Sequence, residues 1–346
     1  MLFKIKNRIE RELSSYVRGL DKAYPLRKLS PLLSASIKEF IARDGKRIRP
    51  LLFCIGYLGF SRRTAPGLFR SALSLELLHD FMLIHDDIID KSAMRRGKPS
   101  MHALLNRYFK KTKGLKFSGE DLAIIIGDVI YALALDAFLA VKEEPKRKEE
   151  ALKKLISAAL YTGSGEFMEL LLGTKPVKEV TRLDVYKIYD FKTANYTFAS
   201  PLTMGALLGG ADKKELKRLF DYGILLGRAF QIKDDIIGTF ATDALTGKSN
   251  LTDIKEAKRT LLIWYAYNHS DTKSRQVVER VFSGKAAGQK ELSEIREIIS
   301  CSGALDYARK EIKALLKRAS RVIRPLKIRR ESRQALNGLS QNIFDL

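Results

Sequence analysis

Cysteine, proline and glycine are scarce in this 346-residue chain, which has 2, 9 and 23 of them respectively. Cys54 and Cys301 stand far apart, with no second cysteine and no histidine at ligand spacing, which excludes a disulfide framework and argues against a zinc site. Few Gly and Pro beside 45% hydrophobic residues also exclude a disordered, collagen-like or linker-rich chain. We therefore expect a globular protein of a reducing compartment, the cytoplasm.

A long hydrophobic run without charges is also missing. The longest apolar stretch, residues 122–141, contains Asp128 and Asp136, and each carboxylate would cost several kcal/mol at the centre of a bilayer. The N-terminus carries a charge every few residues and so lacks the apolar core of a signal peptide. The stretch is expected to be a buried helix of a soluble protein.

Acidic residues are too few to balance the basic ones. The 63 Lys and Arg against 40 Asp and Glu give a net charge of +23, which attracts nucleic acid, anionic lipid or phosphorylated metabolites. No basic patch interleaved with aromatics supports a nucleic-acid partner, so we expect none. Loose association with an anionic membrane surface stays open. The basic stretch at 309–333 is interpreted as the solvated face of a terminal helix.

What the chain does have is apolar residues at helical spacing along most of its length, which predicts an all-α fold in one domain, 1–346. Capping is expected from Thr64 with Pro66, Ser118 with Asp121, and Thr181 with Asp184. The apolar helices at 68–90, 120–141, 154–172 and 219–238 should lie at the centre. Helices are predicted at 4–19, 31–44, 50–60, 66–90, 99–108, 120–142, 147–172, 181–210, 213–238, 252–268, 274–283, 288–299 and 302–322.

Two similar segments, 84–90 and 232–238, place adjacent aspartates at the end of apolar helices. Several carboxylates within one turn repel one another and resist desolvation, so a cation must lie beside them. Asp86 and Asp90 are four residues apart and share a helical face. Oxygen-only ligands suit Mg²⁺, which is usually held by carboxylates together with substrate phosphate. The alternative is neutralisation by Arg or Lys, but two matching clusters on central helices favour the metal.

Basic residues gather at other helix ends near these clusters. Lys46 and Arg49 flank Pro50, expected at the first position of a helix, and so stand at a natural anion site. A metal ringed by cations suits a strongly anionic ligand, and diphosphate fits best. Further cations follow the first cluster or surround the second: Arg95, Arg96, Lys98, Lys192, Lys233, Lys248, Lys258 and Arg259.

From about residue 38 to 307 the chain resembles the trans-isoprenyl diphosphate synthases, also called polyprenyl synthetases. The resemblance rests on motifs in the family's order: 45–50, 76–79, the Asp-Asp-x-x-Asp of 86–90, 95–99, 127–128, 192–198, 230–235 and 246–248. Each motif is weak singly and the set is specific. It implies an all-α isoprenoid synthase-type bundle around a central cavity, a homodimer, and Mg²⁺-dependent alkylation of isopentenyl diphosphate by an allylic diphosphate.

The resemblance also assigns roles to matching residues. Asp86, Asp90 and Asp234 would ligate about three Mg²⁺ ions per active site, supported by Asp87 and Asp235. Isopentenyl diphosphate would bind Lys46, Arg49, His79 and Arg96. The allylic diphosphate would bind Arg95, Lys192, Thr193, Gln231, Lys233, Lys248 and Lys258. No side-chain nucleophile is needed, and the released diphosphate can take the proton. His85 is expected to be structural.

Some residues depart from the family pattern. Gly238 replaces the last aspartate of the second motif, and Glu166 and Glu169 stand where the family commonly has Gln and Asp. Ala241-Thr242 replaces a usual Gly-Asp. The extra negative charge of Glu166 is expected to alter how the allylic group is held. None of these changes removes a residue that the chemistry requires.

Chain length is predicted from the turn before Asp86, where Phe81 and Met82 should point into the hydrocarbon channel. A phenyl ring there limits products to C15–C20, and flexible Met82 favours C20, geranylgeranyl diphosphate, over C15, farnesyl diphosphate. Ordinary core packing is the other explanation of both residues. Two other functions are weighed. A non-catalytic partner subunit of a heteromeric synthase generally loses carboxylates of the first cluster, which this chain retains. A terpene cyclase has no second diphosphate to bind, so the cation set of Lys46, Arg49 and His79 argues against it.

Overall fold

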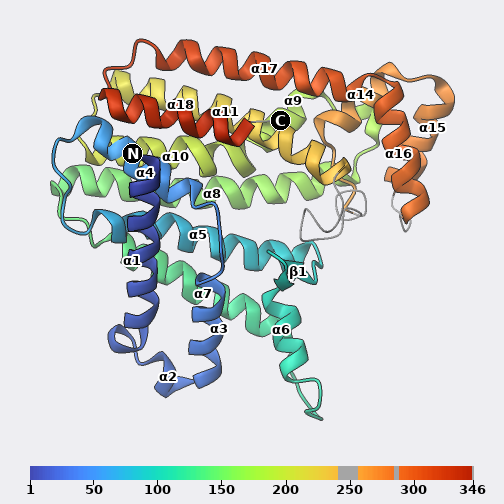
Figure 1. Cartoon of the computed structure of the whole chain (residues 1–346). Coiled ribbons are helices and arrows are strands. Elements are labelled where there is room, and N and C mark those ends of the chain that lie inside the picture. The colour runs from blue at the N-terminus through green and yellow to red at the C-terminus, as the bar shows by residue number, and fades with distance from the viewer. Residues whose placement is uncertain (241–255, 284–287, 345–346) are drawn as a thin grey trace. The chain divides into compact units, whose positions relative to one another are not determined.

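The computed structural model describes residues 1–240, 256–283 and 288–344. These residues are almost entirely helical (Figure 1), so the all-α prediction is confirmed. Close contacts divide the chain into two compact units. The first comprises Met1–Lys153, Met204–Ala211 and Ile328–Leu336, and the second comprises Lys154–Thr203, Asp212–Lys327 and Asn337–Leu346. Compact units defined by contacts do not decide how many domains the chain forms, so the single domain 1–346 stays a prediction.

The first unit is built on α5, whose predicted central position is confirmed. Leu73, Leu77 and Ile84 of this helix are fully buried, and α5 packs against α7, α4 and α1. The elements are α1 (Leu2–Ala23), α2 (Leu26–Leu29), α3 (Pro31–Ile41), α4 (Ile48–Phe60), α5 (Leu68–Ile89), β1 (Met94–Arg95), β2 (Lys98–Pro99), α6 (Met101–Tyr108), α7 (Gly119–Phe138), and parts of α8 (Pro145–Thr174), α10 (Ser200–Leu208) and α18 (Arg330–Phe344).

Helix starts follow the capping predictions in two of three places. Ser118 with Asp121 and Thr181 with Asp184 each form a capping box. Thr64 and Pro66 do not cap α5, which begins at Leu68 after Gly67. Gly67 has a φ of 77°, and a Cβ there would lie 2.1 Å from the Ala140 carbonyl oxygen. Helix α5 therefore begins where the chain passes close to the residues after α7, a contact that the local sequence does not reveal.

A short antiparallel hairpin follows α5 and was not predicted. Met94 pairs with Pro99 and Arg95 with Lys98, and the turn contains Arg96 and Gly97, both with positive φ. Strands of two residues give too little alternation to be recognised in the sequence. The hairpin turns Arg95 and Arg96 back toward α5, where both make ion pairs.

The second unit is built on α11, which packs against η2 and α17. Residues 181–210 were predicted to form one helix. They are helical in the structure, but irregularly so, because the middle segment η2 is π-helical. π-helical turns are rare and often occur at functional sites. The elements are the rest of α8, η1 (Val177–Glu179), α9 (Arg182–Ile188), η2 (Tyr189–Ala199), α11 (Lys213–Phe240), α14 (Leu261–His269), α15 (Thr272–Phe282), α16 (Gln289–Cys301), α17 (Ala304–Ile323) and the end of α18.

Two predictions near the C-terminus were wrong. Helix α14 begins only at Leu261, whereas a helix was predicted from 252, and residues 252–255 lie outside the described part. Helix α18 was missed. Its buried residues Ser332, Ala335, Leu336 and Leu339 follow helical spacing, but serine and alanine give a weak apolar signal, and Gly338 and a basic start obscure it.

Helix α8 also departs from the sequence prediction. It was expected at the centre, yet its large apolar residues Ile156, Leu160, Phe167, Leu170 and Leu171 are exposed. Such a stripe on a helix surface marks an interaction site rather than a core.

Among the described residues, no helix combines the length and the low charge needed to cross a membrane.

Replacing Gly227 on α11 should destabilise the second unit. A Cβ at Gly227 would lie 2.2 Å from Ala194 Cα and 2.5 Å from Ala194 Cβ on η2. Gly227→Ala should therefore lower the free energy of unfolding by roughly 1–3 kcal/mol through overpacking, as measured by urea denaturation. Gly163→Ala on α8 is the control, because nothing lies within 4 Å of its Cβ, and it should stabilise the chain by about 0.5–1 kcal/mol. Equal stability of the Gly227 variant and the unmodified chain would contradict this packing.

Candidate functional site

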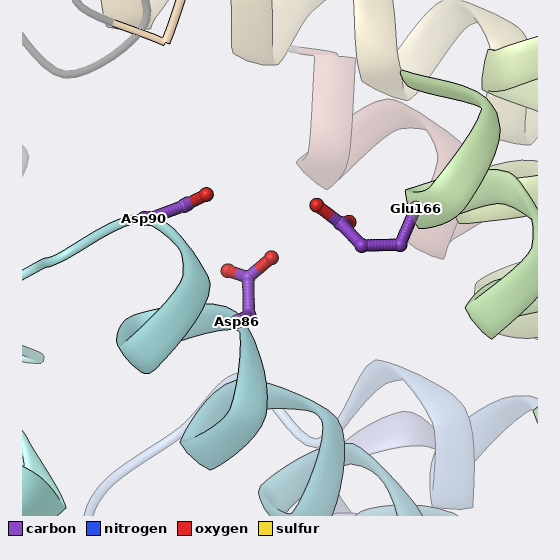
Figure 2. A group of neighbouring side chains, drawn as sticks. All are labelled: Asp86, Asp90 and Glu166. Atoms are coloured by element: carbon purple, nitrogen blue, oxygen red, sulfur yellow. The ribbon is translucent and has the colours of Figure 1, made fainter. Parts of the chain in front are cut away.

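The first aspartate motif lies at the C-terminal end of α5. The backbone N–H of Asp90 donates to the Asp86 carbonyl at 2.8 Å, so the two residues sit one turn apart. Figure 2 shows both carboxylates directed to the same side of the helix end. Asp87 is rotated away and fully buried, whereas the Asp86 side chain keeps 23% of its surface exposed. The predicted common face of Asp86 and Asp90 is confirmed, and their oxygen-only donors suit a hard cation.

Arg95 of the hairpin pairs with two aspartates of this motif. Its Nε lies 2.8 Å from Asp87 Oδ1 and its Nη2 lies 3.2 Å from Asp86 Oδ2. Burial disfavours the guanidinium charge, but the Asp87 and Asp86 charges outweigh burial, and the pKa of Arg95 is raised. Neutralisation by arginine, the alternative to a metal, is thus present at Asp87 and in part at Asp86.

The basic segment before α4 divides into buried and exposed cations. Arg47, with φ of 53°, is the residue before the helix, and its guanidinium is buried in ion pairs with Glu10 at 3.0 Å and Glu76 at 2.6 Å. Lys46 is exposed and Arg49 lies in the first helical turn, as expected for an anion site. Pro50 is the third helical residue and not the first, because α4 begins at Ile48.

Three acids share one buried face of α5, and sequence reasoning did not single out the middle one. Glu76, Asp80 and Asp87 are spaced four and seven residues apart and are all buried. The nearest described cation to Asp80 is Arg96, at 3.6 Å, an ion pair without a hydrogen bond, and both Asp80 carboxylate oxygens lack a hydrogen-bond partner among the described residues. Burial, and then the Glu76 charge, raise the pKa of Asp80 well above its usual value. The signal was available, since acids at helical spacing in an apolar helix require partners.

His79 lies among the cations predicted to bind isopentenyl diphosphate. Burial, and then the charges of Arg49, Arg96 and Arg95, lower the pKa of His79 well below 6.5. The charges of these arginines and burial act in the same direction, since both disfavour a protonated imidazole. A neutral imidazole keeps one N–H donor, which is what an anion requires.

The second aspartate motif lies near the end of α11 in the second unit. Asp235 is buried, accepting hydrogen bonds from the Tyr189 hydroxyl and from Gln231 Nε2, the latter at 2.8 Å. Asp234 is exposed. Thr193 Oγ1 donates to Gln231 Oε1 at 2.6 Å, so η2 and α11 are joined beside the motif. Asp235 is thus held by protein groups of η2 and α11, and its supporting role stays a prediction.

Lys192 of η2 is held between two carboxylates of α8. Its Nζ lies 2.5 Å from both Glu166 and Glu169, and Figure 2 draws Glu166 extending from its helix. Glu166 and Glu169 are two of the positions at which the sequence departs from the family pattern. Two acids around one ammonium group leave a local charge of about −1, which opposes binding of a second anion there.

Other cations predicted to bind the allylic diphosphate have protein partners. Lys233 Nζ donates to the Ile343 carbonyl of α18 at 2.8 Å. Lys258 pairs with Glu256 at 2.6 Å. Lys248 lies outside the described residues. The missed helix α18 thus contacts a predicted substrate residue.

Phe81, the predicted chain-length residue, lies between two aromatic side chains. Its ring centroid is 5.1 Å from that of Tyr131 on α7 and 4.6 Å from that of His85. Gly127 permits this arrangement, since a Cβ there would lie 2.8 Å from the His85 ring. Phe81 and Met82 are both partly exposed on the turn before Asp86.

Comparison with known proteins points to one family. The polyprenyl synthetase family model matches residues 30–299. A geranylfarnesyl diphosphate synthase of Aeropyrum pernix is 31% identical over 322 residues, 90% of this chain and 94% of that protein. A geranylgeranyl diphosphate synthase of Methanosarcina mazei is 29% identical over 312 residues, 89% of this chain and 88% of that protein. The solved structure of a geranylgeranyl pyrophosphate synthase from Corynebacterium glutamicum, complexed with isoprenyl diphosphate and magnesium, has a TM-score of 0.90 and 25% identity, covering 100% of this chain and 99% of that one.

The depressed pKa of His79 should make stability depend on pH. Below 6.5 the unfolded chain binds a proton at His79 that the folded chain does not, so the free energy of unfolding falls as pH decreases from 7 to 5. Over this interval the free energy of unfolding of His79→Gln should fall by roughly 1–2 kcal/mol less than that of the unmodified chain, as measured by urea denaturation at each pH. The exposed His269 gives the control, and His269→Gln should follow the unmodified chain. If the free energy of unfolding of His79→Gln and of the unmodified chain fell equally with pH, the pKa of His79 would not be lowered by folding.

Proposed function

Because this chain belongs to the polyprenyl synthetase family, we propose that it condenses isopentenyl diphosphate with an allylic diphosphate, dimethylallyl, geranyl or farnesyl, to geranylgeranyl diphosphate (C20). Its relatives are prenyl diphosphate synthases, so the chain is a trans-prenyltransferase with a short-chain product. The C20 length, the metal and the residue roles are our proposals. The observation that carries them is the pair Asp86 and Asp90, directed to one side of a helix end.

Mg²⁺ would be held by Asp86, Asp90 and Asp234. The donors fit the ion: they are carboxylate oxygens, and Asp234 is exposed while its neighbour Asp235 is occupied by Tyr189 and Gln231. When bound, Mg²⁺ neutralises the diphosphate and stabilises it as a leaving group. About three ions per active site are proposed, because two diphosphates and several carboxylates need that much positive charge.

Isopentenyl diphosphate would bind to the cations around His79. Lys46 and Arg49 stand at the start of α4, where backbone N–H groups also favour an anion. Arg96 approaches α5 from the hairpin. The lowered pKa keeps His79 neutral, so its role is to donate one N–H to the diphosphate and not to supply charge. Holding the alkene in place makes the coupling step effectively unimolecular.

The allylic diphosphate would bind to Arg95, Lys192, Thr193, Gln231, Lys233, Lys248 and Lys258. Lys192 is already flanked by Glu166 and Glu169. Its role is therefore to present an oriented ammonium group, and the diphosphate must compete with these two carboxylates for it. This competition weakens the hold of Lys192 on the allylic substrate relative to a site with a neutral residue at 166.

The proposed reaction needs no nucleophilic side chain. The C–O bond of the allylic diphosphate breaks, and the allylic carbon forms a bond with the terminal alkene carbon of isopentenyl diphosphate. The new bond leaves a positive charge on the internal alkene carbon. A proton then leaves the CH₂ group between that carbon and the carbon bearing the diphosphate, passes to the released diphosphate, and a new double bond forms, so atoms and charge balance. The protein contributes charge stabilisation and orientation, which are the principal sources of rate enhancement in such sites.

We also propose that the chain acts as a homodimer. The support is the exposed apolar stripe of α8, which includes Leu160, Phe167 and Leu171. A stripe of this kind is typical of a covered interface. Sedimentation equilibrium should give twice the chain mass of 39.2 kDa.

The activity itself can be tested with radiolabelled isopentenyl diphosphate, each allylic primer and Mg²⁺. The purified chain should form a C20 diphosphate, and EDTA should abolish the product. Asp86→Asn and Asp234→Asn should each lower kcat by about 100-fold or more, because charge is lost where the transition state needs it. Asp306→Asn, at an exposed aspartate of α17, should retain full activity. An intact but inactive chain would instead indicate the non-catalytic subunit, and a C15 product would indicate a farnesyl diphosphate synthase.

Phe81 provides a test of the chain-length proposal. Its ring packs on Tyr131 one turn before Asp86, so Phe81→Ala should open space for the growing chain and shift products from C20 to C25 or longer. Thin-layer chromatography of the hydrolysed products measures the shift. Phe117→Ala, which removes an exposed ring elsewhere, should leave product length unchanged. An unaltered distribution in the Phe81 variant would identify Phe81 as core packing only.

A further inference from the structure

The second unit contains a groove of about 640 Å³ between η2, α11 and α17. Its lining residues include none of those proposed to bind the metal or the substrates. Figure 1 shows α17 running along α11. The volume falls within the usual range for a small-molecule site. Lys192, Thr193 and Gln231 do not line it, so the groove uses other faces of η2 and α11.

The floor of the groove is apolar. It is formed by Phe191, Phe220, Ile224, Leu225 and Val322. All but Leu225 are partly exposed, so apolar surface meets solvent here on three different elements. A hydrocarbon chain would remove that surface from water, which is favourable in proportion to the area covered.

The rim carries positive charge that the rim's own acids do not balance. Arg228 pairs with Asp190 through two contacts, at 2.6 and 2.5 Å, and Asp221 pairs with Lys217 at 3.1 Å. Arg318 and Arg321 of α17 also line the groove and are exposed. Among the described residues neither makes a hydrogen bond or an ion pair. Two guanidinium groups one turn apart suit a phosphate, which each can contact through two N–H groups.

We propose that this groove binds an anionic amphiphile, a hydrocarbon chain with a phosphate or diphosphate head group. The chain lies against Phe220, Ile224 and Val322, and the head group lies on Arg318 and Arg321. Both a prenyl diphosphate and a phospholipid have this chemistry. The proposal does not depend on the proposed function, because it rests on residues outside the catalytic assignment.

The first test uses dodecyl phosphate, below its micelle concentration, with the full chain. Isothermal titration should show binding that Arg318→Glu/Arg321→Glu weakens about tenfold or more. Ile224→Trp, which fills the floor without changing charge, should weaken it likewise. Lys310→Glu/Lys313→Glu is the matched control: it reverses two exposed cations on the same helix at the same spacing and should bind as the unmodified chain does.

A photoreactive alkyl phosphate locates the site independently of affinity. A benzophenone at the end of the alkyl chain should label residues 220–225 or 322, as mapped by mass spectrometry. Labelling confined to the first unit would overturn the proposal. Equal weakening by the control variant would also overturn it, because the binding would then reflect diffuse surface charge.

Two further arms distinguish the sources of the ligand. Geranylgeranyl diphosphate is titrated into the chain, and cosedimentation is measured with vesicles of phosphatidylglycerol or of phosphatidylcholine. The ligand is the soluble diphosphate if its binding is weakened by Arg318→Glu/Arg321→Glu but not by Lys310→Glu/Lys313→Glu. The ligand is the anionic lipid if cosedimentation with phosphatidylglycerol vesicles shows this pattern instead. If the charge-reversed variant changes the oligomeric mass instead, the groove is an interface between copies and the proposal fails.

Discussion

Burial of carboxylates inside an apolar helix is the constraint on which the first unit depends. Glu76, Asp80 and Asp87 share one face of α5, and a buried carboxylate is tolerated only when it is paired or protonated. The partners are Arg47 from the start of α4 and Arg95 and Arg96 from the hairpin. The need for compensation thus draws two separate segments onto α5, and these segments carry the other cations of the proposed substrate site.

Both aspartate motifs divide the work between adjacent residues. Neighbours on an α-helix point about 100° apart, so an adjacent pair cannot face one direction. Asp87 and Asp235 are buried and bound to protein groups, whereas Asp86 and Asp234 reach the surface. The buried member is fixed by protein groups, and the outer member is the one proposed to ligate the metal. This explains why each motif needs two aspartates although metal binding is assigned to one of each adjacent pair.

The helices η2 and α11 carry residues of both the proposed allylic diphosphate site and the proposed amphiphile site. One side carries Lys192, Thr193 and Gln231, held in place by carboxylate and hydroxyl contacts. The other borders an apolar groove with arginines on its rim. Close backbone approach at Gly227 keeps the two helices in contact.

The amino-acid sequence by itself determined the helical class, the capping boxes at Ser118 and Thr181, and the family motifs, because these depend on residues close together in the chain. Only the tertiary structure decided the hairpin after α5, helix α18, the Asp80 environment and the carboxylates around Lys192. The local signals of the hairpin and of α18 are too short or too weak to recognise, whereas the Asp80 environment and the carboxylates around Lys192 depend on groups from different elements brought together by packing. Local periodicity carries no information about such distances, since it reports which face of a helix is buried but not what lies against it.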